Sequence, residues 1–104
     1  MILYHLSNTY IQMLTPQLGG NRHLNEESGA VGKKVIWFCN KIMVDDPPSK
    51  YLYTVDIDDK DPNLFFATEM NELFIKMDNS VCWYYYTLPV TVINIAKWTS
   101  QGYK

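Results

Sequence analysis

The first candidate for chemistry is His5, which lies in the opening stretch Leu3-Tyr4-His5-Leu6-Ser7. A neutral imidazole offers one N–H donor and one acceptor nitrogen, so it can hold a ribose hydroxyl where it faces a cleft. Side chains alternate along a strand, and His5 therefore faces the same side as Leu3. Two interpretations follow: a histidine satisfied within the core, or a histidine that lines a ligand pocket.

A second candidate is Arg22, the only arginine of the chain, which precedes His23 in a glycine-rich stretch. Arginine suits two-point contacts with phosphate or carboxylate, and loop amides can add further donors to a phosphate. Residues 17–34 hold four of the five glycines, which predicts a loop of unusual length. Long loops in compact domains are usually functional or disordered. Arg22 is therefore either a phosphate ligand or an exposed loop residue.

Aromatic side chains concentrate in two runs, Trp37-Phe38 and Trp83-Tyr84-Tyr85-Tyr86. Because side chains alternate along a strand, each run sends rings to both faces of a sheet. Half-exposed flat rings can stack on a base or on a nicotinamide. The alternative for each ring is a place in the core or on the sheet surface.

Metal binding and nucleophilic catalysis are not indicated. The acidic stretch at residues 56–61 lacks the glycine and the glutamate that a calcium-binding EF-hand loop needs, and it fits a solvated turn. Cys39 and Cys82 form no C-x-x-C pair, which argues against structural zinc, and each lies in an apolar run that predicts a buried, reduced thiol. No phosphate-binding loop, dinucleotide fingerprint or serine-nucleophile motif occurs.

Short strands must position these residues. The pattern predicts strands at residues 2–6, 35–39, 51–57, 81–86 and 90–98. Residues 64–77 are ambiguous between a strand at 64–66 and a short helix around 69–76, and residues 40–46 fit a helical turn. Strands do not alternate with long helices, so a doubly wound parallel sheet is not expected. We predict the α+β class: one compact, mainly antiparallel β domain over residues 1–104, with five to six strands and one or two short helices.

Net charge and apolar pattern restrict the location and the partners. The net charge is −2, with nine acids and three lysines between residues 45 and 78. A charge this small gives no field that would concentrate nucleic acid or anionic lipid, so neither is an expected partner. The sequence has no apolar stretch of membrane-spanning length and no signal-peptide pattern. The expected location is the cytoplasm.

The opening Leu3-Tyr4-His5-Leu6-Ser7 resembles the first strand of the ADP-ribosyltransferase fold, in which small enzymes often begin LYHGS or LYHGT. Rifampin-type transferases and RNA 2′-phosphotransferases share that start. The aromatic strand at residues 35–38, the stretch at residues 51–57 and the segment from Trp83 to Ile93 are similar to later parts of the family pattern. The resemblance covers most of the chain loosely.

The resemblance implies a binding site for NAD or a related nucleotide. In the family, a histidine on the first strand holds the ribose, which corresponds to His5, and an aromatic residue stacks on the nicotinamide, which corresponds to Trp37 or Phe38. With Arg22 as the phosphate ligand, the residues expected to bind the cofactor are Tyr4, His5, Arg22, Trp37 and Phe38.

The resemblance also implies a catalytic set. A third family position, commonly glutamate, stabilises positive charge at the anomeric carbon. The nearest acids in this chain are Glu69 and Glu72, so the expected catalytic residues are His5 with Glu69 or Glu72. No metal ligand is expected.

Two functions from different classes follow. The leading hypothesis is a small ADP-ribosyltransferase-like protein that binds NAD or a related nucleotide and, if active, transfers ADP-ribose to a protein, a nucleic acid or a small molecule. The sequence leaves open whether the protein is an enzyme. The alternative is a non-catalytic inhibitor of the kind that phages and mobile elements encode, which binds a host protein or sequesters a signalling nucleotide and releases it unchanged.

Overall fold

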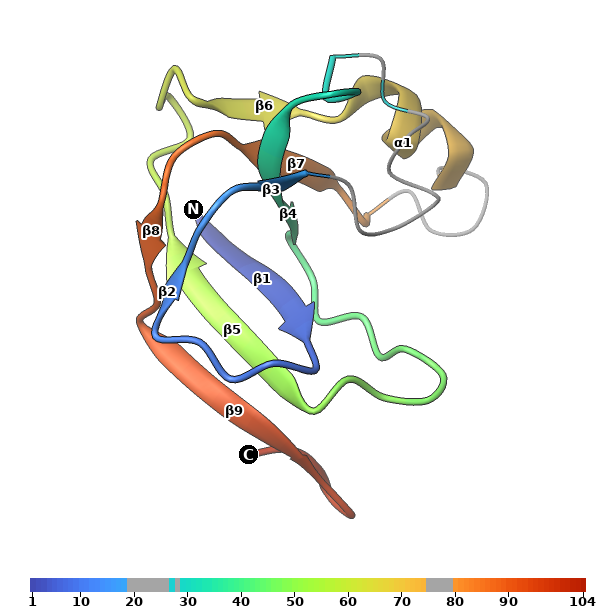
Figure 1. Cartoon of the computed structure of the whole chain (residues 1–104). Helices are drawn as coiled ribbons and strands as arrows, with labels where there is room; N and C mark the ends of the chain where they lie inside the picture. The colour runs from blue at the N-terminus through green and yellow to red at the C-terminus, as the bar shows by residue number, and fades with distance from the viewer. Residues whose placement is uncertain (19–26, 28, 75–79) are drawn as a thin grey trace.

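The computed structural model describes residues 1–18, 27, 29–74 and 80–104, which contain ten strands and one helix (Figure 1). In chain order these elements are β1 (Ile2–Ser7), β2 (Met13–Leu14), β3 (Gln17–Leu18), β4 (Lys34–Cys39), β5 (Tyr51–Asp56), β6 (Leu64–Phe66), α1 (Thr68–Phe74), β7 (Trp83–Tyr86), β8 (Val90–Thr91), β9 (Asn94–Thr99) and β10 (Gly102–Tyr103).

The main sheet is antiparallel, and the pairing between its two central strands, β1 and β4, is short. Its strands run in the order β10-β9-β5-β1-β4-β7-β6, and β3 also pairs with β4. β1 pairs with β5 over six residues, whereas its register with β4 is limited to Tyr4↔Cys39. The sheet therefore consists of two halves that meet at one position, with β1, β5 and β9 in one half and β4, β6 and β7 in the other (Figure 1).

The predicted α+β class is confirmed, but the predicted five to six strands are too few. Six strands have three or more residues, and β2, β3, β8 and β10 have two residues each. A two-residue strand carries no alternation that a sequence pattern can reveal, because only its partner across the ladder defines it. Residues 40–46 form no helix, and the ambiguous stretch at residues 64–77 contains both β6 and α1.

Two clusters of buried side chains lie on opposite faces of β4 and β7, so these strands have almost no polar residues to alternate with apolar ones. One cluster fills the space between the two halves of the sheet: Leu3, Leu14, Ile36, Phe38, Tyr53, Val55, Ile57 and Tyr86. The other lies beneath α1: Ala30, Val35, Trp37, Ala67, Met70 and Tyr85.

The helix α1 has seven residues, which is too short to be stable without tertiary contacts. Its first turn is capped from far along the chain, because the buried Glu27 carboxylate accepts the N–H groups of Glu69 (2.8 Å) and Met70 (3.1 Å). The side chain of Asn71 in turn donates to the Trp83 carbonyl (3.0 Å) and accepts its N–H (2.7 Å). These contacts fix α1 against β7.

Candidate functional site

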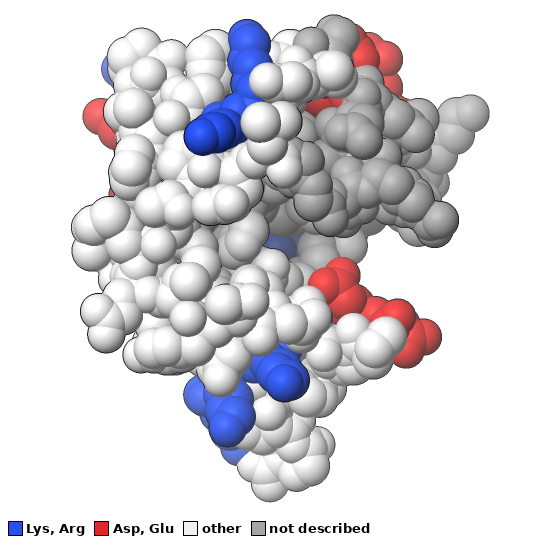
Figure 2. Space-filling model, viewed as in Figure 1, with Lys and Arg blue, Asp and Glu red and all other residues white. Residues whose placement is uncertain are grey.

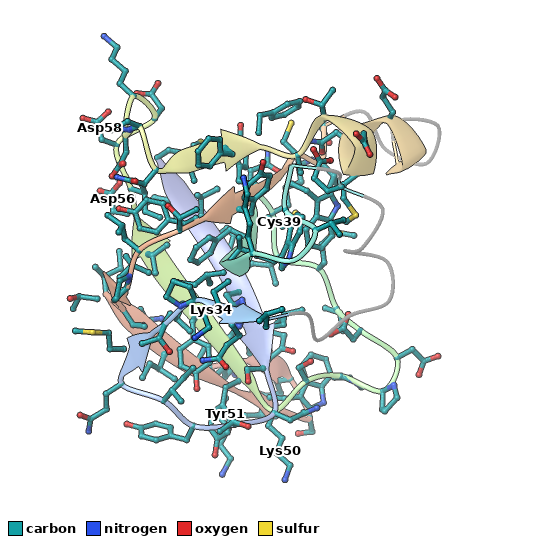
Figure 3. All side chains as sticks on the ribbon, turned by 45° about the horizontal axis from the view of Figure 1, so that its top comes forward. Lys34, Cys39, Lys50, Tyr51, Asp56 and Asp58 are labelled. Atoms are coloured by element: carbon teal, nitrogen blue, oxygen red, sulfur yellow. The ribbon has the colours of Figure 1, made fainter. Side chains whose placement is uncertain are left out.

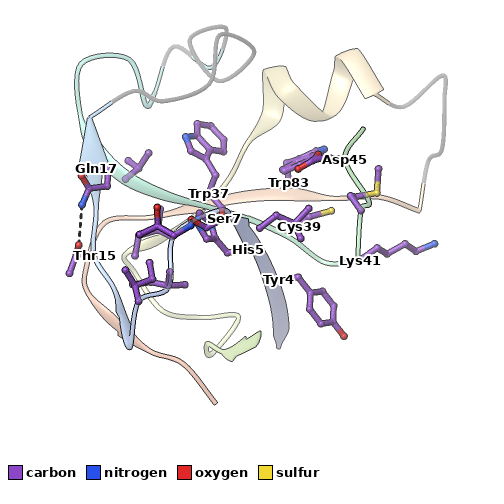
Figure 4. Close-up of a pocket in the computed structure, with 17 residues that line it drawn as sticks. Tyr4, His5, Ser7, Thr15, Gln17, Trp37, Cys39, Lys41, Asp45 and Trp83 are labelled. Carbon is purple, nitrogen blue, oxygen red and sulfur yellow. Dashed lines mark hydrogen bonds between the residues drawn. The ribbon is translucent and has the colours of Figure 1, made fainter. Parts of the chain in front are cut away.

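A cleft of about 600 Å³ opens where β1 separates from β4 (Figure 4). Its walls come from β1, the segment from Thr9 to Gln17, β4 and the loop after β4, and we name it the β1–β4 cleft. Figure 2 shows the surface hollowed there, beside acidic side chains and with a basic side chain within the hollow. Its charged and polar lining residues include Ser7, Thr9, Thr15, Gln17, Lys41 and Asp45.

Where β1 and β4 separate, the side chain of His5 takes the place of a backbone hydrogen bond between the two strands. Its Nδ1 lies 2.8 Å from the carbonyl oxygen of Trp37, on the strand that β1 no longer pairs with at this point. Because a carbonyl oxygen only accepts, we assign the proton to Nδ1, and Nε2 is then an acceptor in the neutral ring. No described residue hydrogen-bonds Nε2. The side chain of His5 thus both joins the two halves of the sheet and lines the cleft.

The surroundings keep His5 neutral. Burial lowers the pKa of the imidazole below 6.5, and the hydrogen bond to the Trp37 carbonyl opposes that shift only in part. The rings of Phe38 and Tyr53 lie 6.0 Å and 6.2 Å from the imidazole, centroid to centroid. At neutral pH the cleft therefore presents a hydrogen-bond acceptor at this position and no positive charge.

The two aromatic candidates on β4 occupy different places. Trp37 lines the cleft, and its indole is largely buried against the Tyr85 ring, at 5.3 Å between centroids. Phe38 is fully buried in the core and does not line the cleft. Of this pair, only Trp37 lines the cleft together with His5, whereas the Phe38 ring packs beside His5 from the core. Trp83, which begins the second aromatic run named in the sequence but was not among the residues expected to bind the cofactor, lines the cleft as well.

Tyr4 lines the cleft from the other face of β1 (Figure 4). Tyr4 and His5 are consecutive, so their side chains point to opposite faces of the strand, and Figure 4 shows the Tyr4 ring directed away from His5. On this side the lining includes Cys39 and Lys41. Cys39 is a buried free thiol, as the sequence predicted, and Cys82 is also free but only half-buried. Burial raises the pKa of the Cys39 thiol.

The acids expected to complete a catalytic set lie elsewhere. Glu69 and Glu72 belong to α1, where Glu69 is half-buried and Glu72 is exposed, and neither lines the cleft. The acid that lines the cleft among the described residues is Asp45, whose Oδ2 accepts a hydrogen bond from Ser49 Oγ at 2.8 Å. Nothing in the sequence associated Asp45 with His5. Arg22 lies outside the described residues.

Tyr53 fixes the wall of the cleft opposite β4. Its side chain is fully buried, and its hydroxyl donates to the Thr9 carbonyl (2.5 Å) and accepts the Ile11 N–H (2.9 Å). Thr9 and Ile11 both line the cleft. A tyrosine in an alternating strand gives no sign of such a contact, because its partners lie more than 40 residues away in the chain.

Over the described ranges, no three His, Cys, Asp or Glu side chains gather closely enough to hold a metal ion, and no helix there is long and apolar enough to cross a membrane. The cleft offers a neutral acceptor nitrogen, indole surface, hydroxyl groups and one lysine. That set suits a ligand with a flat ring and hydroxyl donors. Comparisons with protein-family models, with curated proteins and with solved structures found no match.

Proposed function

We propose that this chain binds NAD or a related nucleotide in the β1–β4 cleft. The observation that carries the proposal is the bond between His5 Nδ1 and the Trp37 carbonyl, because it leaves Nε2 as an acceptor for a ribose hydroxyl. The half-exposed Trp83 supplies indole surface for a flat ring, the largely buried Trp37 adds only the small part of its indole that is exposed, and Lys41 supplies a positive charge for a phosphate. The resemblance of the first strand to ADP-ribosyltransferases supports the same ligand class.

The proposal is binding, and transfer of ADP-ribose is not part of it. In the family that the first strand resembles, a residue that is commonly glutamate stabilises positive charge at the anomeric carbon, and here Glu69 and Glu72 lie on α1, away from the lining of the cleft. Asp45 lies at the cleft but is exposed, so water weakens its electrostatic effect. Release of the bound nucleotide unchanged is therefore the expected outcome, as in a protein that sequesters a nucleotide. A cytoplasmic location remains a prediction from the sequence.

The experiment is a titration with NAD, ADP-ribose and AMP, in which binding is measured from the change in tryptophan fluorescence and in the melting temperature. The test variant is His5→Asn, because an asparagine amide can still donate to the Trp37 carbonyl but has no acceptor where Nε2 stood. We expect about a tenfold loss of affinity, which corresponds to about 1.4 kcal/mol. The control is Asn94→Ala, at an exposed position on β9 outside the cleft lining.

The proposal fails if none of the three nucleotides changes the fluorescence or the melting temperature at millimolar concentration. It also fails if His5→Asn binds as tightly as the control. A second measurement separates binding from turnover: the nucleotide is recovered after heat denaturation and identified. Intact NAD supports binding without transfer, whereas free nicotinamide in stoichiometric excess over the protein establishes catalysis.

A further inference from the structure

The strand β6 forms one edge of the sheet, and among the described residues it pairs with β7 alone. Two hydrogen bonds at its ends show which backbone groups face β7. The Asn63 carbonyl accepts the Thr87 N–H (3.2 Å), and the Ala67 N–H donates to the carbonyl of Trp83 (3.0 Å). Residues 63, 65 and 67 therefore direct their backbone groups at β7, because this direction alternates along a strand.

Residues 64 and 66 must then direct their backbone groups away from the sheet. The Leu64 N–H is used locally, since it donates to the Asp61 carbonyl at 3.1 Å. The N–H and C=O of Phe66 and the C=O of Leu64 have no partner in the described part of the chain. One residue of an added strand can accept the Phe66 N–H and donate to the Phe66 carbonyl, as in an ordinary antiparallel pair.

Aromatic side chains flank this open edge on both faces of the sheet. Phe65 is 41% exposed and stacks on Tyr85 at 5.1 Å between centroids, whereas Phe66 is 50% exposed and meets Tyr84 edge-on at 5.5 Å. An added strand would place its alternating side chains beside Phe65 on one face and Phe66 on the other. Natural edge strands are usually protected by short length, lysine, proline or a bulge. With three residues β6 is short, but its sequence, LFF, contains no lysine and no proline.

The chain on both sides of β6 is acidic. Residues 56–72 contain six carboxylates and one lysine, with exposed Asp58 and Asp59 before β6 and exposed Glu72 after it. Figure 3 shows Asp58 on the turn that leads into β6, after Asp56 at the end of β5, whose carboxylate is already paired with the N-terminal ammonium at 2.9 Å. A second copy of this chain, paired edge to edge, would bring like charges together, which costs free energy. A lysine- or arginine-bearing strand would instead meet opposite charge at both ends.

We propose that the β6 edge binds an extended, basic segment of a partner protein by strand addition, with backbone pairing at Phe66, apolar contacts to Phe65 and Phe66, and basic side chains beside the flanking carboxylates. This surface is separate from the β1–β4 cleft, because no residue of β6 lines that cleft. It gives Glu72 a role in charge complementarity. The proposal does not depend on nucleotide binding.

The probe is a short synthetic peptide in which lysine and valine alternate, and the matched peptide has glutamate in place of lysine. Binding is followed by the amide NMR signals of the full chain during titration. We expect the lysine peptide to shift and protect the Phe66 amide, and the glutamate peptide to leave it unchanged. Because charge pairs at a surface are screened by salt, raising the salt from about 0.05 M to about 0.5 M should weaken binding several-fold.

Two variants test the surface directly. Asp59→Lys reverses an exposed charge that has no hydrogen bond or ion pair with a described residue, and we expect three- to tenfold weaker binding as an order-of-magnitude estimate. Its control is Asp46→Lys, the same charge change at an exposed site on the loop after β4, which should leave binding unchanged. Phe66→Pro removes the N–H at an edge position where proline is tolerated, and it should abolish binding.

Any of three results would overturn the proposal. The first is a Phe66 amide that does not respond to the lysine peptide, and the second is equal binding of the lysine and glutamate peptides or of the two charge variants. The third is a concentration-dependent shift of the Phe66 amide without peptide, together with a dimer in solution, because a second copy would then occupy the edge. If Phe66→Pro does not fold, the comparison of the two peptides and the comparison of Asp59→Lys with Asp46→Lys still test whether the β6 edge binds a basic strand.

Discussion

The hydroxyl of Tyr53 connects the core to the cleft, and its removal is a sharp test of the structure. Tyr53→Phe deletes one oxygen and leaves the ring, so the packing of the fully buried side chain is kept. The variant loses the bond donated to the Thr9 carbonyl and the bond accepted from the Ile11 N–H. Both partners belong to the backbone of a cleft wall.

The size of the effect follows from these two bonds. A typical intramolecular hydrogen bond contributes about 1 kcal/mol to stability, and an unsatisfied buried group costs about 1–3 kcal/mol. Thr9 is exposed and Ile11 is half-buried, so water can replace part of the loss at both groups. We therefore expect the free energy of unfolding to fall by about 2 kcal/mol. For a domain of this size that lowers the melting temperature by roughly 8–16 °C.

The assay is urea denaturation combined with amide hydrogen exchange at Ile11. The control is Tyr10→Phe, the same chemical change at a side chain that is 58% exposed and whose hydroxyl bonds no described residue. We expect the control to stay within about 0.5 kcal/mol of the wild type. Equal stability of the two variants, or unchanged exchange at Ile11 in Tyr53→Phe, would refute the idea that this hydroxyl holds the wall.

The remaining predictions concern α1, the turn before β4 and the imidazole. Glu27→Ala removes the acceptor of two amides at the start of α1 and should cost about 2 kcal/mol, measured by urea denaturation; a loss below about 0.5 kcal/mol would contradict the cap. Gly29→Ala would place a Cβ 2.5 Å from the hydroxyl oxygen of Tyr85, and the Tyr85 ring is packed against the rings of Trp37 and Phe65. We therefore expect the free energy of unfolding to fall by about 1–3 kcal/mol in the same assay. An unchanged free energy of unfolding would show that the Tyr85 ring can move. Burial lowers the pKa of His5, so the unfolded chain binds the proton more readily than the folded chain. The free energy of unfolding should therefore rise with pH between the lowered pKa and 6.5, by up to about 1.4 kcal/mol per pH unit, and should level off above 6.5. This contribution to the pH dependence should be absent from His5→Asn.

The long strands were predictable because their apolar residues are contiguous or alternate. The runs at residues 35–39 and 51–57 become β4 and β5 with little change in their limits. Residues 90–98 were expected as one strand, but β8 and β9 are separate because Thr91 pairs with Met13 whereas Asn94 begins the ladder with β5. Which of several partners a short segment pairs with is decided by tertiary contacts, and a linear pattern does not contain them.

The sequence predicted only those residues of the candidate site whose own type and local motif suggest a binding role. His5 and Trp37 were both named from the sequence, and both line the cleft. Asp45 and Tyr53 were not, because their significance comes from what lies beside them in space. Asp45 is an acid in an expected helical turn, and Tyr53 is an aromatic in an expected strand. The same is true of Glu27, whose carboxylate caps a helix that begins 41 positions later.

The sequence posed two alternatives for His5, a core histidine or a pocket histidine, and the structure makes them compatible. One ring nitrogen satisfies the Trp37 carbonyl where the β1–β4 ladder ends, which is a structural role. The same bond fixes the tautomer, so the other nitrogen accepts, which is what a hydroxyl ligand requires. A cleft formed by an interrupted ladder needs some side chain to take the exposed carbonyl. Histidine can do so and still offer an acceptor on the far side of its ring, at a position that the shorter asparagine side chain does not reach. This is why His5→Asn should separate the stability of the fold from its affinity for a nucleotide.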